Sequence, residues 1–163
     1  MSAIEREPNH VVKEIWQKGH IGKKFNIAKA LSAEQYLPLR NNLNAASMFI
    51  FPVKRKGGHF MMLSQMQDNI LLWTFLDDYQ KKGFLSTPNL IFVFFEELMK
   101  SKDLVLVRGD LTDGFLTKDE ANELFTNMVS FYQNPELFND FVLPFNRNSS
   151  EFDMKKYCRL MEI

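Results

Sequence analysis

The stretch MFIFPVKRKGGHFMMLSQM, residues 48–66, decides the fold. Its two flanks, 48–53 and 59–66, are apolar and aromatic, which is typical of β-strands. The Gly57-Gly58 pair between them supplies the positive φ angles that a tight hairpin turn requires. The sequence therefore predicts a β-hairpin here, around which the rest of the chain is arranged.

Further strands and helices extend this hairpin. A polar turn at 67–69 leads into a third apolar run, so we expect an antiparallel meander. Thr117 and Glu120 form a capping box, and behind them apolar residues recur at helical spacing up to Tyr132. The predicted strands are 70–75, 90–95 and 103–107, the last ending in a turn at Arg108-Gly109-Asp110. The predicted helices are 9–18, a short one from Ser32, 76–82, a turn at 96–100, 118–133 and 152–161, with a helical turn and then an extended segment over 136–145.

Strands flanked by helices in this order predict an α+β fold, a mostly antiparallel β-sheet with helices packed on it. A length of 163 residues suits a single domain. Within it, residues 1–46 are predicted to form an N-terminal helical arm, because few of them are strongly apolar, with a loop at 41–44. Residues 47–163 form the α+β unit.

Composition excludes several functional classes. Lys+Arg and Asp+Glu both total 20, so the chain lacks the net positive charge that dominates nucleic-acid binding. The first forty residues lean positive, which we interpret as a solvated face, with an acidic partner as the alternative. The apolar run 90–95 is too short to cross a bilayer, and Cys158 is alone, so no intramolecular disulfide can form. We expect a monomer that binds no nucleic acid and does not insert into membranes.

Motifs that carry chemistry are missing from the sequence. His10, His20 and His59 lack partners at metal-ligand spacing. Neither a phosphate-binding loop nor a serine-nucleophile elbow is present. The adjacent carboxylates Glu96-Glu97 are interpreted as a solvated face, because neighbours on a helix point in different directions. We therefore expect no catalytic residue, no metal and no cofactor, and predict that the chain is not an enzyme.

The unusual feature of the composition is its 16 Phe and 9 Met residues. Phe and Met are favoured at protein–protein interfaces, and Met suits surfaces that adapt to a partner, so we interpret the chain as a binding protein. The phenylalanines within periodic segments are assigned to the core: Phe49, Phe51, Phe60, Phe75, Phe92, Phe94 and Phe125. The partner-binding candidates lie outside clear periodic elements, with core packing as the alternative for each: Phe84, Leu85, Phe115, Phe138, Phe141 and Phe145.

Four segments together resemble one protein family. Residues 48–55 resemble the FxxPhxR strand of the assembly factor 1 family, the mitochondrial chaperones of the F-type ATP synthase catalytic β subunit. Residues 76–80 resemble that family's L-x-E/D-Y helix start, and 104–110 resemble its hVLhRG-acidic strand. Residues 120–132 are similar to its closing helix, which ends in Phe-Tyr. The four lie in the family's order and spacing, although Asp110 replaces the usual Glu.

The resemblance implies a mitochondrial matrix protein in its mature form, without a presequence. It implies binding to the unassembled catalytic β subunit of the ATP synthase, whose exposed interface the chaperone would shield from aggregation. The α subunit would then replace the chaperone. The resemblance implies neither nucleotide turnover nor a metal.

Two other interpretations stay open. A small-molecule-binding or enzymatic α+β domain would have a deep pocket on the sheet with convergent polar groups. A stable structural subunit of a larger complex would co-purify with the finished assembly at fixed stoichiometry.

Overall fold

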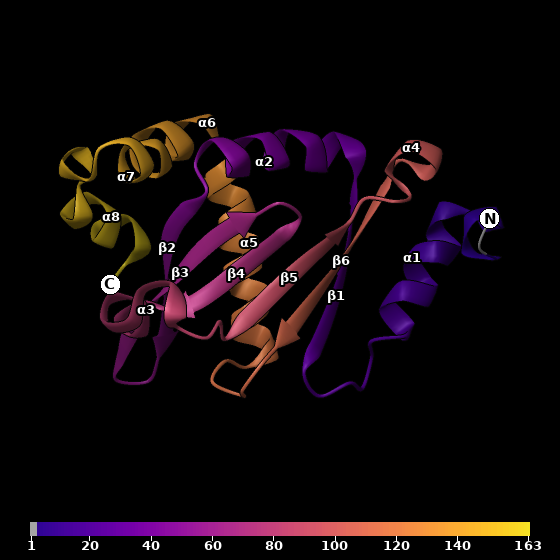
Figure 1. Cartoon of the computed structure of the whole chain (residues 1–163), viewed down its shortest axis with the longest axis horizontal. Helices are drawn as coiled ribbons and strands as arrows, with labels where there is room; N and C mark the ends of the chain where they lie inside the picture. The colour runs from indigo at the N-terminus through magenta and orange to yellow at the C-terminus, as the bar shows by residue number, and fades with distance from the viewer. Residues whose placement is uncertain (1–2) are drawn as a thin grey trace.

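One six-stranded antiparallel sheet organises the computed structural model, which describes residues 3–163 (Figure 1). The strand order is β1-β6-β5-β4-β3-β2. The strands are β1 (Asn26–Ser32), β2 (Met48–Arg55), β3 (Gly58–Gln67), β4 (Ile70–Phe75), β5 (Leu90–Phe95) and β6 (Leu104–Leu111). This arrangement confirms the predicted α+β class and its mostly antiparallel sheet.

Eight α-helices flank the sheet among the described residues: α1 (Asn9–Lys18), α2 (Ala33–Ala45), α3 (Leu76–Lys82), α4 (Met99–Lys102), α5 (Lys118–Gln133), α6 (Pro135–Leu137), α7 (Leu143–Arg147) and α8 (Met154–Met161). Short turns complete the chain: the 3-10 turns η1 (Ala3–Arg6), η2 (Gly83–Leu85) and η4 (Ser149–Glu151), and the π-helical turn η3 (Phe138–Val142). Figure 1 shows α5 behind the sheet, α1 to the right of β1 and α3 at the lower left.

The predicted hairpin and meander are confirmed. β2 pairs with β3 from Met48 opposite Gln65 to Arg55 opposite Gly58, and Gly57 in the turn has a φ of 92°. β3 then pairs with β4, and Asp68 in the connecting turn also has a positive φ. The turn residues and the apolar runs of the sequence are thus sufficient to predict strands β2, β3 and β4.

Helix α5 covers the inner face of the sheet. Thr117 Oγ1 accepts from the Glu120 N–H at 3.1 Å, and Glu120 Oε2 accepts from the Thr117 N–H at 2.9 Å, so the predicted capping box begins the helix. The aromatic side chains of α5 then lie against those of the strands, with Phe125 and Phe92 ring centroids 4.8 Å apart. Of the seven phenylalanines assigned to the core, five are buried, while Phe60 and Phe75 are half-buried.

Within residues 3–163, helices cover the outer face of the sheet at its two ends and leave its middle open. Val12 of α1 packs with Leu104 and Leu106 of β6. The ring centroids of Trp16 in α1 and Phe95 in β5 are 5.5 Å apart. At the other end α3 packs against β3 and β4, where its Tyr79 hydroxyl lies 3.4 Å from Gln65 Nε2.

The sequence did not indicate β1, and the predicted loop at 41–44 is wrong. β1 contains few strongly apolar residues and is formed by its pairing with β6, from Asn26 opposite Asp110 onward. Residues 41–44 belong to α2, because Leu39 and Leu43 bury one helical face and Asn42 Nδ2 donates to the Tyr132 carbonyl at 2.7 Å. The boundary at residue 46 stays a prediction, although the segment before it supplies a strand of the common sheet.

The predicted turn at Arg108-Gly109-Asp110 is also wrong, because β6 continues through it to Leu111. A Cβ at Gly109 would lie 2.6 Å from Ile27 Cγ1 and 2.6 Å from Phe92 Cε1. Glycine is therefore required by the close approach of side chains from both neighbouring strands.

Residues 135–147 are helical throughout, so the predicted extended stretch within 136–145 is wrong. Pro144 lies in the first turn of α7, which continues directly from the π-helical turn, so the helix runs through the proline. Phe141 lies in the π-helical turn before α7, and its ring centroid is 5.7 Å from that of Tyr157.

The crowding around Gly109 generates a stability prediction. We expect Gly109→Ala to lower the free energy of unfolding by about 1–3 kcal/mol, because the added methyl displaces the buried Ile27 and Phe92 side chains. Chemical denaturation measures the loss. Gly58→Ala is the matched control, since a Cβ there meets no atom within 4 Å, and it should change stability by less than about 0.5 kcal/mol. Equal effects of the two substitutions would contradict the close-approach explanation.

Candidate protein-binding surface

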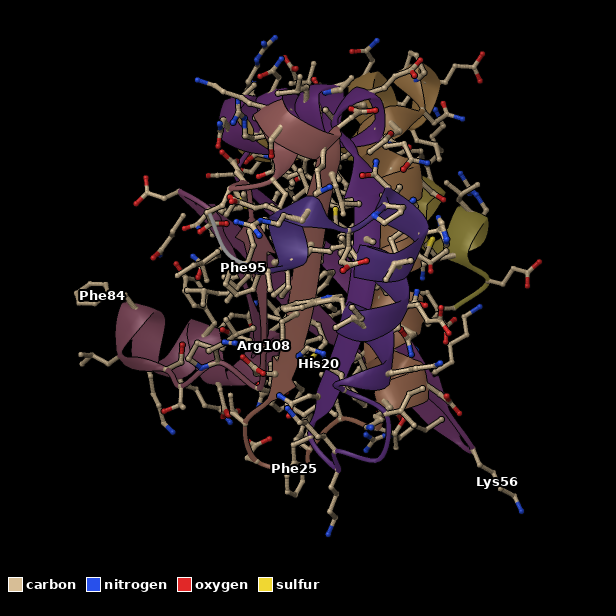
Figure 2. The ribbon with its side chains drawn as sticks, turned by 90° about the vertical axis from the view of Figure 1, so that its right-hand side faces the viewer. His20, Phe25, Lys56, Phe84, Phe95 and Arg108 are labelled. Atoms are coloured by element: carbon tan, nitrogen blue, oxygen red, sulfur yellow. The ribbon has the colours of Figure 1, made fainter. Side chains whose placement is uncertain are left out.

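The most exposed apolar side chains form a tip after α3. Phe84 is 93% exposed and Leu85 is 79% exposed. Helix α3 ends at Gly83, whose φ of 58° redirects the chain, and the Ser86 N–H and hydroxyl both donate to the Gly83 carbonyl, at 3.0 and 2.6 Å. Figure 2 shows Phe84 projecting from the side of the sheet opposite α5. Both side chains are therefore presented by a hydrogen-bonded turn.

Asn89 anchors the base of this projection. Its buried side chain accepts from the Phe75 N–H at 2.9 Å and donates to Asp113 Oδ2 at 2.9 Å, while its own N–H donates to the Trp73 carbonyl at 2.8 Å. These bonds join the end of β4 to the start of β5. The segment between β4 and β5, which contains Phe84, is thereby fixed to the sheet at both ends.

An apolar strip lies on the outer face of the sheet between α1 and α3. It consists of Ile70 and Leu72 of β4 with Ile91 and Val93 of β5, all half-buried. Ile70 is opposite Val93 and Leu72 is opposite Ile91 in the strand register. No helix crosses this part of the sheet in Figure 1. We call these four residues the open strip.

The other predicted binding residues pack against the protein itself. Phe138 and Phe141 are buried, at 9% and 3% exposure. Phe115 and Phe145 are both half-buried. The ring centroids of Phe115 and Phe60 are 5.1 Å apart, and those of Phe145 and Phe49 are 5.4 Å apart. The structure thus brings Phe84 and Leu85 together on the surface and places the remaining four in or against the core.

Arg55 forms an ion pair with Glu120 beside Phe115. Its Nε and Nη2 donate to the two carboxylate oxygens of Glu120 at 2.7 and 2.9 Å, and Nη2 also donates to the Phe115 carbonyl at 2.6 Å. The guanidinium lies 4.8 Å from the centroid of the Phe60 ring. The pair therefore links the β2–β3 hairpin to the start of α5.

Glu96 is not simply solvated, so that interpretation of Glu96-Glu97 is wrong for the first residue. The Tyr36 hydroxyl donates to Glu96 Oε1 at 2.6 Å, and Arg40 Nη1 donates to both carboxylate oxygens at 3.1 Å. Partial burial raises the pKa of Glu96, but these hydrogen bonds outweigh it and lower the pKa overall. The network joins α2 to the end of β5.

Open grooves mark one edge of the sheet. Two of them, of about 420 and 350 Å³, lie side by side along β1 between α1 and α5. Within residues 3–163 no three His, Cys, Asp or Glu side chains gather as a metal site would require. In the same range no helix is long and apolar enough to cross a membrane.

Comparison with known proteins assigns the family. A family model described as ATP11 protein matches residues 1–158. This chain belongs to the ATP11 family. A relative from Danio rerio, named ATP synthase mitochondrial F1 complex assembly factor 1, is 23% identical over 154 residues, covering 93% of this chain and 50% of the relative. Protein atp11, mitochondrial, from Schizosaccharomyces pombe is 24% identical over 139 residues. This match covers 82% of this chain and 48% of the relative.

Membership of the ATP11 family confirms the resemblance that the four sequence segments indicated. The chain spans about half the length of the curated relatives it matches. Both relatives are named as mitochondrial proteins. Of the residues that carried the resemblance, Arg55 holds α5 to the hairpin and Gly109 allows three strands to pack closely, so these two stabilise the fold.

The Arg55–Glu120 pair generates a pH-dependent stability prediction. The hydrogen bonds from Arg55 are the main cause that lowers the pKa of Glu120 below its usual 4.5. A carboxyl group with a lowered pKa stabilises the fold above about pH 4.5, and this contribution is lost as the pH falls through the lowered value. We expect Glu120→Gln to lower the free energy of unfolding by about 1 kcal/mol at pH 7.

The difference between wild type and Glu120→Gln should shrink as denaturation is repeated at decreasing pH below about 4.5. Glu123→Gln changes an exposed carboxylate of the same helix and serves as the control, for which we expect no comparable loss. A destabilisation by Glu120→Gln that stays constant between pH 7 and pH 3 would contradict an electrostatic role.

Proposed function

We propose that this chain is an assembly chaperone of the F-type ATP synthase that acts in the mitochondrial matrix. The match to the ATP11 family over residues 1–158 carries the proposal, because a relative is named as an F1 complex assembly factor. The chain binds the free catalytic β subunit, prevents its aggregation and yields it to the α subunit. This activity requires neither a catalytic residue nor a cofactor.

The exposed apolar surface supports this function. A subunit destined for a ring exposes obligate-interface surface, which is more apolar than ordinary protein surface. The open strip and the tip at Phe84 and Leu85 offer apolar area for such a client on the outer side of the sheet. Release needs only that the α subunit bind the β subunit more tightly than this chain does.

The decisive experiment mixes the purified chain with isolated β subunit. Warming the mixture while light scattering is recorded should show less aggregation than the β subunit alone, and gel filtration should show a complex. Added α subunit should displace the chain. If the β subunit neither binds nor aggregates less, while circular dichroism confirms a folded chain, the chaperone function is wrong. Persistent binding of all three proteins would contradict the handover and favour a structural subunit.

The tip is expected to contribute directly to client binding. The double substitution Phe84→Ser with Leu85→Ser should weaken β-subunit binding about tenfold or more in calorimetry, because both lost side chains are available to a partner. The melting temperature should stay nearly unchanged, since neither side chain packs in the core.

The matched control is Met154→Ser with Leu160→Ser. These residues of α8 are 44% and 47% exposed and lie outside the tip and the open strip. Their replacement should leave β-subunit affinity within about twofold. If both double variants weaken binding equally, the tip has no specific role and general surface hydrophobicity explains the effect.

A further inference from the structure

The two edge strands of the sheet are finished differently. The β2 edge, at the C-terminal side of the molecule in Figure 1, is capped by side chains from the helices beside it. Asn146 Oδ1 accepts from the Met48 N–H at 3.0 Å, and Asn146 Nδ2 donates to the Met48 carbonyl at 2.6 Å. The Tyr157 hydroxyl donates to the Ile50 carbonyl at 2.6 Å. Pro52 then removes the next outward donor, since it has no N–H.

The β1 edge is capped only at its end, where Gln35 Oε1 accepts from the Ser32 N–H at 3.0 Å, and within the described residues its middle has no such caps. The Leu111 N–H donates to the Phe25 carbonyl at 2.8 Å, which fixes the alternation of the antiparallel ladder between β1 and β6. It follows that Ile27, Lys29 and Leu31 direct their main-chain groups toward β6. Ala28 and Ala30 direct theirs outward, and no hydrogen bond within residues 3–163 reaches those four groups.

A groove runs along this open edge. Ala28, Ala30 and their neighbours form its floor. Gln17 of α1 and His20 in the turn after α1 form one wall, and α5 forms the other. The half-buried Val129 is the apolar side chain that the α5 wall presents, with the exposed Thr126 and Ser130 beside it and the buried Phe125 behind it. Figure 2 shows this side of the molecule, with β1 between α1 and α5. The groove therefore combines an unpaired strand edge with an apolar side chain on one wall.

The groove also contains positive charge. The Lys29 ammonium group lies 5.1 Å from the centroid of the Phe125 ring, and burial lowers the pKa of this lysine. Among residues 3–163, no carboxylate is within ion-pair distance of it. Lys118 lines the continuation of the groove. A carboxylate in a bound segment would pair with Lys29 in a site that is already partly desolvated.

We propose that the β1 edge binds an extended segment of the client polypeptide as a seventh strand. The segment pairs its main chain with Ala28 and Ala30, places an apolar side chain against Val129, and carries an acidic residue for Lys29. Strand addition of this kind gives affinity through the main chain and selectivity through alternate side chains. The inference rests on the proposed function, because the client is the β subunit.

A second copy of this chain fits the groove less well than a single strand. Pairing of two β1 edges would bring the α1 and α5 walls of one copy against those of the other. It would also bring two partly desolvated Lys29 side chains into one site, which like-charge repulsion disfavours. The groove therefore suits a client segment that has no helices packed beside it.

Amide hydrogen exchange of the wild-type chain tests the inference. In the free chain the Ala28 and Ala30 amides should exchange rapidly, whereas those of Ile27, Lys29 and Leu31 are already bonded to β6. Saturation with isolated β subunit should slow the two outward amides at least tenfold. Suppressed aggregation without this protection would overturn the strand addition and leave the chaperone function standing. If the β subunit does not bind the wild type, both proposals fail.

Ala28→Pro provides a second measurement, because it removes one outward N–H without removing a donor to β6. It should weaken β-subunit binding about tenfold, whereas Ala28→Val keeps the N–H and should change affinity less than about threefold. Equal affinities of the two folded variants would overturn the inference. If the proline variant does not fold, the exchange experiment decides. Sedimentation that shows a dimer with the same two amides protected would assign the edge to a second copy and overturn the client proposal.

Discussion

The packing of α5 across the inner face of the sheet is the interaction on which the rest of this structure depends. Phe125 and Phe131 of α5 lie against Phe92 and Phe51 of the strands, with ring centroids 4.8 and 5.6 Å apart. Aromatic pairs at such distances add stability beyond the area they bury. This layer holds most of the large aromatic side chains. Among residues 3–163, the outer face is covered by α1 and α3 alone, and its middle stays open (Figure 1).

Local sequence signals predicted the elements that local chemistry controls. The Gly57-Gly58 turn, the Thr117 capping box and the apolar runs of β2 to β5 all appear in the structure as expected. β1 has no such signal, because residues 26–32 become a strand only through pairing with β6. The role of Gly109 was equally hidden, since it depends on side chains from two strands that are distant in sequence.

The candidate surface shows the same limit. Phe84 and Phe138 both lie outside periodic segments, yet one is 93% exposed and the other 9%. The residues before each phenylalanine explain the difference. Gly83 ends a helix with a positive φ and turns the chain outward, whereas Asn134 caps a new helix whose first residue is Pro135. Start and stop signals therefore separate the two, and composition does not.

The two edges of the sheet are protected in different ways, and this difference bears on the proposed release of the client. Capping of β2 by Asn146 and Tyr157 closes an edge that could otherwise pair with other chains. At β1, the inward-facing Lys29 disfavours pairing with apolar strands and with a second copy, whereas the proposed client strand would bring a carboxylate to it. Main-chain pairing over a few residues gives moderate affinity, which a rightful partner burying a larger interface can exceed. A chaperone that acts as proposed would therefore release its client without an energy source.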